Sequence, residues 1–342
     1  MTFQGESIVK LPLIIGHRGA KGIAPENSLS GFKKAIELGI DGVELDVHLT
    51  KDGKLVVIHD MNLKRLTGLK ILIKQLTFKE LRKYDISEFF IKEQENVLKK
   101  LPEEKRYFIE LRTIQNNAFY LNIFEQITRK RISFYLHWDG KQFDIVKKLF
   151  FPRGDGKKIG FKQLKIKKKD ILDLEKGRIR KYHNECIPLL SETLKILKGK
   201  LSINIEIKGG EKVYPGIIDK LVEKTESFGY NNILFSCFDR NTVILLKERY
   251  PELKVNGLYV KLINPKKYVN GLDGLNPYYF WGTKRLVSYF HQLDKTVYVW
   301  TVNKDIDMVR FVLYGVDGIV TNYPQVLKKI SKAIQTILGD IF

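Results

Sequence analysis

Residues 11–19 read Leu-Pro-Leu-Ile-Ile-Gly-His-Arg-Gly, an apolar run that stops at Gly16, directly before His17 and Arg18. A short apolar run without polar alternation is typical of a strand that is buried on both faces, as in a parallel sheet. The stretch therefore predicts a buried strand whose end presents an imidazole and a guanidinium. These two groups suit proton transfer and phosphate binding.

The next elements continue this pattern. Asn27 or Ser28 can cap a helix that Gly39 ends. A second strand is expected over 41–50, and after a turn a third apolar run lies at 55–58. Strand, helix and strand in this order begin a β/α fold with a parallel sheet.

Glu44 and Asp46 are two residues apart on the second expected strand, so their carboxylates point to the same face. Two such carboxylates repel each other unless a positive charge lies between them, and an oxygen-rich site suits Mg²⁺, Ca²⁺ or Mn²⁺ better than Zn²⁺. The alternative is a solvated strand face with two unrelated acids. Val43, Leu45 and Val47 weaken that alternative, because they indicate a buried strand.

Further motifs occur in a fixed order along the chain. They are His17-Arg18-Gly19, Pro25-Glu26-Asn27, Glu44-Leu45-Asp46, Thr50-Lys51-Asp52-Gly53, His59-Asp60, residues 187–192, Glu206-Ile207-Lys208, Ser236-Cys237-Phe238-Asp239, residues 299–303 and residues 315–321. In this order and spacing they resemble the glycerophosphodiester phosphodiesterases. The resemblance covers residues 11–88 and 187–326 and leaves out the middle of the chain.

The resemblance implies an α/β fold, a (β/α)8 TIM barrel, and the length agrees with it. Without residues 89–186 the chain keeps about 240 residues, close to the roughly 250 of a typical barrel. We expect a barrel built from 1–88 and 187–342, with a basic α+β insertion of unknown role at 89–186 between the second and third strands. The eight strands are expected at 12–17, 41–48, 202–208, 232–238, 254–260, 272–278, 296–302 and 317–321.

One segment of the insertion competes for the place of the third strand. Residues 107–112, followed by a helix-like run and an apolar run at 132–136, echo residues 203–208 and the segment after them. We place 203–208 in the barrel because the motif at 187–192 and the helix after it lead directly into this segment. Glu110 then lies outside the site, but it is the alternative to Glu206 as third metal ligand.

The resemblance implies a metal and a phosphate site. One divalent cation, Mg²⁺ or Ca²⁺ with Mn²⁺ as a third choice, is expected on Glu44, Asp46 and Glu206. Arg18 and Lys208 are expected to bind phosphate oxygens.

The resemblance also implies the catalytic residues. His17 and His59 are expected to act as general acid and base on opposite sides of the phosphorus, because the pKa of imidazole lies near neutrality. The substrate's own neighbouring hydroxyl would attack, giving a cyclic phosphate that water opens, and either histidine can be the first base. Trp300 and Phe238 are expected to line the substrate pocket.

Two other residues are expected to have minor roles in the site. His48 lies at the exit of the second strand and is expected to contact the turn or solvent. Asn322 stands where the resemblance implies an aspartate, and we expect this difference to affect only a structural hydrogen bond.

The charge of the chain concentrates in the insertion. Residues 89–186 carry 24 Lys and Arg against 13 Asp and Glu, about half of the net charge of +21. The densest part, 162–169, alternates basic and apolar residues like a half-buried strand. It is either a solubilising face or a weak contact with an anionic membrane surface. No nucleic-acid-binding module is recognisable, so no specific nucleic-acid partner is expected.

The composition indicates a soluble globular chain. Cys186 and Cys237 are too few for a disulfide framework or a zinc cluster, residues 1–10 lack the apolar core of a signal peptide, and no apolar stretch is long enough to span a bilayer. We therefore expect a cytoplasmic protein. The expected function is metal-dependent hydrolysis of glycerophosphodiesters to glycerol phosphate and an alcohol. The alternatives are a lysophospholipase D or sphingomyelinase D-like lipid enzyme, or a non-catalytic barrel that binds phosphodiesters or polyanions.

Overall fold

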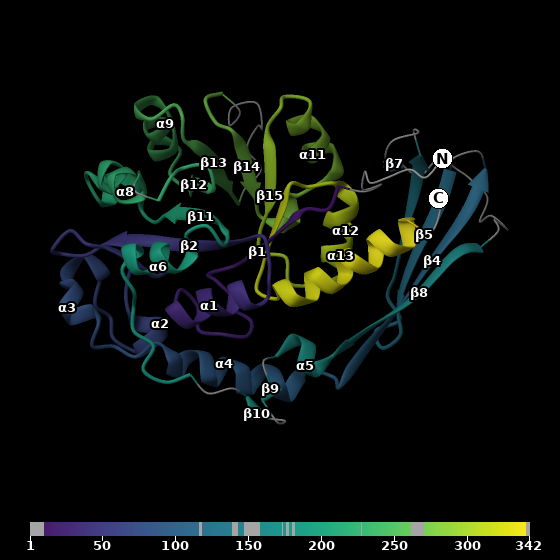
Figure 1. Ribbon diagram of the computed structural model, residues 1–342, viewed down its shortest axis with the longest axis horizontal. Coiled ribbons are helices and arrows are strands. Elements are labelled where there is room, and N and C mark those ends of the chain that lie inside the picture. Colours follow the sequence, from purple (N-terminus) through teal and green to yellow (C-terminus); the bar gives the residue numbers. More distant parts are fainter. Residues whose placement is uncertain are drawn as a thin grey trace.

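Eight parallel strands close into a barrel in the computed structural model, which describes residues 10–115, 118–138, 143–146, 158–172, 174–175, 178–179, 182–226, 228–260 and 270–339 (Figure 1). The order is β1-β16-β15-β14-β13-β12-β11-β2, and β2 pairs back to β1. The strands are β1 Leu13–Gly16, β2 Gly42–Leu49, β11 Ser202–Ile207, β12 Ile233–Cys237, β13 Lys254–Tyr259, β14 Gly274–Pro277, β15 Thr296–Val299 and β16 Gly318–Thr321. Every strand predicted for the barrel is confirmed.

Alternation along the strands separates the apolar core from the barrel interior. In β2, Val43, Leu45 and Val47 are completely buried in the main hydrophobic core, to which the surrounding helices also contribute. Glu44 and Asp46 point the other way, into the barrel. The period of two in a strand forces this division.

Amides and a hydroxyl form a polar layer inside the barrel. Ser236 Oγ donates to Asn204 Oδ1 at 2.9 Å, and Asn256 Nδ2 donates to Asn276 Oδ1 at 2.9 Å. These four side chains are buried. Their hydrogen bonds make it possible to bury polar groups here without leaving most of them unpaired.

Helices follow the strands and cover the outside of the barrel. Ser28 caps the first of them, since its Oγ accepts a hydrogen bond from the Gly31 amide at 2.9 Å, and Gly39 follows its end with a φ of +58°. The helices around the barrel are α1 Leu29–Glu37, α6 Leu190–Leu197, α7 Gly210–Val213, α8 Ile217–Glu226, α9 Arg240–Arg249, α11 Lys284–His291, α12 Asp305–Tyr314 and α13 Pro324–Gly339. In the part of the chain that the structure describes, no helix has the length and apolarity needed to cross a membrane.

A short excursion after β2 builds one side of the barrel mouth. β3, Leu55–Val57, pairs antiparallel with β2, and a second small apolar core lies beneath the segments after it. These segments are α2 Lys64–Thr67, a 3₁₀ turn at Ile73–Gln75, α3 Phe78–Leu81 and α4 Ser87–Lys100. The residues between β3 and α2 include His59, so the excursion carries an expected catalytic residue.

The insertion forms a five-stranded antiparallel sheet in the order β7-β6-β5-β4-β8. Its elements are β4 Glu104–Gln115, β5 Ala118–Glu125, β6 Arg131–Trp138, β7 Phe143–Val146 and β8 Lys158–Lys167, followed by α5 Lys168–Ile171 and a hairpin of β9 Leu174–Glu175 and β10 Arg178–Ile179. The prediction of a helix after residue 112 is wrong, because this part of the chain forms the strand β5. Residues 107–112 pair with β5 and β8, outside the barrel, and α4 crosses the expected boundary at residue 88.

The final helix lies between the inserted sheet and the barrel (Figure 1). α13 packs on β8 and β4 with one side and on β1 and β16 with the other. Gly160 allows the close approach, since a Cβ there would lie 3.1 Å from Ile337 Cγ1. Asp305 at the start of α12 accepts a hydrogen bond from the Tyr107 hydroxyl of β4, and its Oδ2 lies 3.2 Å from Lys105 Nζ. These contacts fix the base of the sheet against the barrel.

Replacing Tyr107 by phenylalanine tests this attachment. The change removes a buried hydrogen bond to a carboxylate, so we expect the free energy of unfolding to fall by about 2 kcal/mol. Tyr107→Phe should increase the rate of hydrogen exchange in β4 and β8 more than in the barrel strands. Tyr120→Phe, on the outward face of the same sheet, is the matched control and should change neither quantity. Equal unfolding free energies for Tyr107→Phe and the unchanged protein would contradict the assigned contact.

Candidate active site

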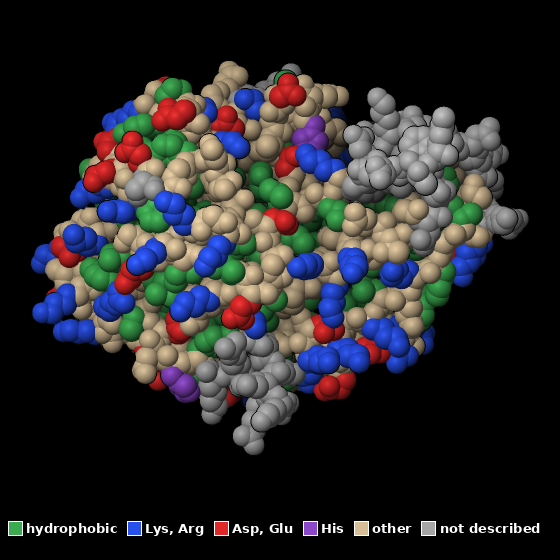
Figure 2. Space-filling model, viewed as in Figure 1, with side chains coloured by type: hydrophobic (Ala, Val, Ile, Leu, Met, Phe, Trp, Pro, Cys, Tyr) green, Lys and Arg blue, Asp and Glu red, His purple; other side chains and the backbone are tan. Residues whose placement is uncertain are grey.

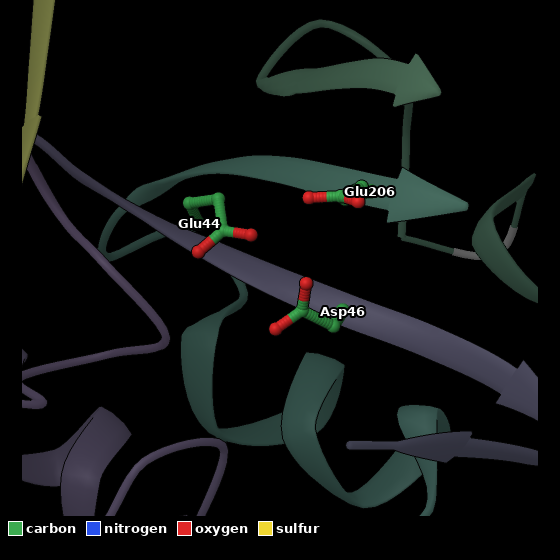
Figure 3. A group of neighbouring side chains, drawn as sticks. All are labelled: Glu44, Asp46 and Glu206. Atoms are coloured by element: carbon green, nitrogen blue, oxygen red, sulfur yellow. The ribbon is translucent and has the colours of Figure 1, made fainter. Parts of the chain in front are cut away.

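Three carboxylates from two neighbouring strands meet in the barrel mouth (Figure 3). Glu44 and Asp46 come from β2, and Glu206 comes from β11, where it lies in register with Asp46. All three are buried, and one oxygen of each lies within 4.8 Å of the others. The structure thus brings together the three residues expected to bind a metal ion.

The positive charges beside this cluster are Lys208 and Arg18. Lys208 Nζ lies 2.9 Å from Asp46 Oδ1 and also contacts Glu206, and Arg18 Nε lies 3.4 Å from Asp46 Oδ2. Burial would raise the pKa of Asp46, but Lys208 and Arg18 outweigh it and hold that pKa well below its usual value. Burial, Asp46 and Glu206 together raise the pKa of Glu44. Two side-chain cations are therefore insufficient to keep all three carboxylates charged.

The cluster fits a divalent cation. Asp46 Oδ1 and Glu206 Oε1 are buried, and the Lys208 ammonium lies beside both of them. One ammonium leaves acceptor capacity on these oxygens unused, and a set made only of carboxylates favours Mg²⁺, Ca²⁺ or Mn²⁺. Asn27 Nδ2 donates to Asp46 Oδ2 at 2.8 Å and fixes the orientation of this carboxylate.

A cavity of about 140 Å³ opens above the carboxylates. Eight of the nine expected site residues line it, and Asp46 lies beside it in the carboxylate cluster. The eight are His17, Arg18, Glu44, His59, Glu206, Lys208, Phe238 and Trp300. Glu110 is not in the carboxylate cluster; it lies on β4 with its carboxylate 2.9 Å from the Arg112 guanidinium.

His17 is held by Asn322. Nδ1 of His17 lies 2.6 Å from Asn322 Oδ1, and an amide oxygen only accepts, so Nδ1 carries the proton. The lone pair of Nε2 is then free on the side of Glu44, whose Oε2 lies 3.8 Å away. Burial lowers the pKa of His17 well below its usual value, and Arg18 and Lys21 add to this effect. The hydrogen bond expected at Asn322 is present, and it holds a residue that lines the cavity.

His59 is held by a carboxylate instead. Its Nδ1 donates to Asp60 Oδ1 at 2.6 Å, and Arg65 Nε donates to Asp60 Oδ2 at 2.6 Å. Arg65 also donates two hydrogen bonds to Glu26, at 2.6 and 3.0 Å. A chain of charged hydrogen bonds thus fixes the ring of His59.

Glu26 connects the two sides of the cavity. Besides Arg65, it accepts a hydrogen bond from Arg18 at 2.8 Å and lies 3.0 Å from Lys21 Nζ. Burial would raise the pKa of Glu26, but Arg18, Arg65 and Lys21 hold it far below the usual value. Glu26 therefore stays ionised and positions both Arg18 and, through Arg65, the support of His59.

His48 is completely buried, so the expectation that it contacts the turn or solvent is wrong. Its Nε2 donates to the backbone oxygen of His59 at 3.1 Å, and its Nδ1 accepts from the Tyr214 hydroxyl at 2.8 Å. Burial lowers the pKa of His48 to about 4. The neutral ring therefore fixes the backbone at His59.

Aromatic rings form part of the cavity wall. Trp300 Nε1 donates to the backbone oxygen of Asn276 at 2.7 Å, and its ring meets those of Phe238 and Tyr278 edge to face at 5.6 and 5.5 Å. This places Trp300 and Phe238 on the cavity, as expected from the sequence.

Comparison with known proteins agrees with this geometry. Residues 17–326 match the model of the glycerophosphoryl diester phosphodiesterase family. The chain belongs to this family. Membership makes it a phosphoric diester hydrolase, as the sequence predicts.

Relatives of this family align over nearly the whole chain. A glycerophosphodiester phosphodiesterase from Caldanaerobacter subterraneus subsp. tengcongensis is 28% identical over 92% of this chain and 96% of its own. One from Bacillus altitudinis is 27% identical, over 94% and 99%. A phosphodiesterase from Oleispira antarctica, solved in complex with the product sn-glycerol-3-phosphate, superposes with a TM-score of 0.64 over 94% and 97% at 20% identity. The last similarity concerns the fold alone.

Three supporting residues of the site, Glu26, Asn27 and Asp60, lie in the motifs that carry the family resemblance. The motifs do not show which residues these side chains contact. Arg65 and Tyr214 lie in no motif, so only the structure reveals them.

Glu26→Gln should make the free energy of unfolding less dependent on pH in the acid range. The ionised carboxylate stabilises the fold above pH 4.5, the ordinary pKa of glutamate, and this contribution is lost as the pH falls toward the depressed pKa of the folded state. We therefore expect Glu26→Gln to lower the free energy of unfolding by about 3 kcal/mol at pH 7. The difference should shrink below pH 4.5. Urea unfolding between pH 3 and pH 8 measures it.

Glu37→Gln is the matched control, because Glu37 is exposed and pairs with Lys34, three residues earlier on α1. It should change the free energy of unfolding by less than about 0.5 kcal/mol at any pH. A loss for Glu26→Gln that is the same at pH 3 and pH 7 would contradict the assigned ionisation.

Proposed function

We propose that this chain hydrolyses glycerophosphodiesters to glycerol phosphate and an alcohol, with one divalent cation on Glu44, Asp46 and Glu206. The observation that carries the proposal is the convergence of these carboxylates with two imidazoles and two cationic side chains on one small cavity. The product-bound relative from Oleispira antarctica supports the choice of substrate. The bound cation would supply Lewis-acid stabilisation of the charge that develops on the phosphoryl oxygens.

Arg18 and Lys208 would bind the phosphate. Both line the cavity, and both are held in place by carboxylates, Arg18 by Glu26 and Lys208 by Asp46. Their charges also stabilise the transition state, in which negative charge accumulates on the phosphoryl oxygens. Positioning by ion pairs reduces the reorganisation that the reaction needs.

His17 and His59 would move the protons. In the first step the substrate's neighbouring hydroxyl attacks phosphorus and gives its proton to Nε2 of one neutral imidazole. The bond to the alcohol breaks, and the other ring, which starts as an imidazolium, protonates the leaving oxygen from Nε2. In the second step water opens the cyclic phosphate with the two roles exchanged. Both rings present Nε2 to the reaction, because both hold a proton on Nδ1 for Asn322 or Asp60.

The size of the cavity favours a small substrate. Its volume of about 140 Å³ is smaller than the roughly 300–1,000 Å³ of pockets for drug-sized ligands. A phosphate with a glycerol and a short alcohol fits such a space better than a lipid with an acyl chain. The aromatic wall of Trp300 and Phe238 supplies an apolar contact for the carbon atoms of the substrate.

An activity assay with exchanged metals tests this function. Hydrolysis of glycerophosphocholine should stop in EDTA and return with Mg²⁺, Ca²⁺ or Mn²⁺, and it should be faster than hydrolysis of lysophosphatidylcholine. Glu206→Gln should lower kcat/KM by at least about 100-fold, because it removes a charged ligand of the cation.

Glu110→Gln is the matched control, since it makes the same change at the acid outside the cluster, and it should keep both activity and metal dependence. Full activity in EDTA would contradict the role of the metal. Faster hydrolysis of lysophosphatidylcholine would instead favour a lysophospholipase D.

Asn322→Leu tests how His17 is oriented. Without the acceptor for Nδ1 the ring loses its tautomer and its orientation, so kcat should fall by about 10 to 100-fold with little change in KM. Asn322→Asp keeps an acceptor and should retain most of the activity, while His17→Ala marks complete loss. An unchanged kcat for Asn322→Leu would show that Asn322 has no positioning role.

A further inference from the structure

The outward face of the inserted sheet carries a group of aromatic side chains. On β4, Tyr107, Ile109 and Leu111 point inward and are buried, so the alternate residues face outward. We define the aromatic face as the rings on the outward side of β4, β5, β6 and β8: Phe108, Tyr120, Phe124, Tyr135 and Phe161.

The rings of the aromatic face form two groups that contact across the strands. The centroid of Phe108 lies 6.3 Å from that of Phe124 and 6.2 Å from that of Phe161, and Tyr120 and Tyr135 are 5.0 Å apart. Phe161 has 51% of its surface exposed, and the other four rings are partly exposed. Aromatic rings that gather on one face and stay partly exposed are typical of an interaction site.

The rim of the aromatic face is basic. Lys158 Nζ lies 4.0 Å from the centre of the Phe161 ring, and Lys165 and Lys167 are exposed on the same strand. Arg131 is exposed opposite Phe124. Figure 2 shows Lys and Arg side chains gathering at the lower right edge of the molecule, where β8 meets α5.

The acids on the same side of the sheet do not cancel this charge. Glu104 pairs with Arg106 at 2.5 Å, and Glu110 pairs with Arg112 at 2.9 Å. Among the residues whose side chains the structure describes there, the lysines of β8 then leave an excess of positive charge. A partner of this face must be anionic, and it must also accept aromatic rings.

We propose that the aromatic face binds the surface of an anionic lipid bilayer. The charges left over are mainly lysines, which act as diffuse point charges, whereas the two arginines of β4 are already engaged and are unavailable for bidentate phosphate recognition. Lysines attract anionic headgroups, and aromatic rings insert at the level of the headgroups. The binding is peripheral and reversible, and it does not depend on the proposed reaction, because the face lies outside the barrel.

Sedimentation with vesicles tests this binding. The full chain should bind phosphatidylcholine vesicles that contain about 30% phosphatidylglycerol, bind pure phosphatidylcholine at least about tenfold more weakly, and dissociate as salt is added. Lys165→Ser with Lys167→Ser should weaken binding to the anionic vesicles at least about tenfold. Phe161→Ser should weaken it by about tenfold through the lost apolar contact.

Lys220→Ser with Lys224→Ser is the matched control, since it removes the same charge from exposed positions on α8. This pair should bind vesicles like the unchanged protein, and all variants should hydrolyse soluble glycerophosphocholine normally. Equal binding to neutral and anionic vesicles would overturn the proposal, as would an equal loss in the control pair. It would also be overturned if Phe161→Ser abolished binding to a single-stranded RNA 12-mer but left vesicle binding unchanged.

Discussion

Three carboxylates buried within 4.8 Å of one another are the constraint on which the active site depends. Like charges at this distance in a poorly solvated cavity repel strongly, so the fold must either protonate them or surround them with positive charge. The sequence supplies Arg18 and Lys208, which hold Asp46 ionised, while the pKa values of Glu44 and Glu206 stay raised. A divalent cation would relieve the remaining repulsion, and it would also place a Lewis acid beside the phosphate.

The same constraint explains the surroundings of the cavity. Glu26 holds Arg18 beside the cluster and, through Arg65 and Asp60, reaches the ring of His59. His48 fixes the backbone of His59, and Asn322 fixes the ring of His17. The groups that would bind phosphate and move protons are thus held by hydrogen bonds from β2, from α2 and from the loops around the barrel mouth. Such positioning is what catalysis without large reorganisation requires.

The barrel and the main residues of the site could be predicted from the sequence, because their signals are local. An apolar run predicts the first strand, the family resemblance implies a barrel of eight strands, and spacing by two residues predicts that Glu44 and Asp46 share a face. The supporting contacts are not local: His17 and Asn322 are 305 residues apart, and His48 and Tyr214 are 166 apart. Nothing in the spacing of these pairs shows that they meet. The run after residue 112 was expected to be helical, but pairing with β4 and β6 makes it a strand, because tertiary contacts override weak local preference.

Anomalous scattering from crystals grown with Mn²⁺ locates the proposed cation among Glu44, Asp46 and Glu206. One strong anomalous peak is expected between the three carboxylates, bonded to an oxygen of each, with Lys208 displaced from at least one of them. A peak at another place, or no peak among these oxygens at saturating Mn²⁺, would exclude this site.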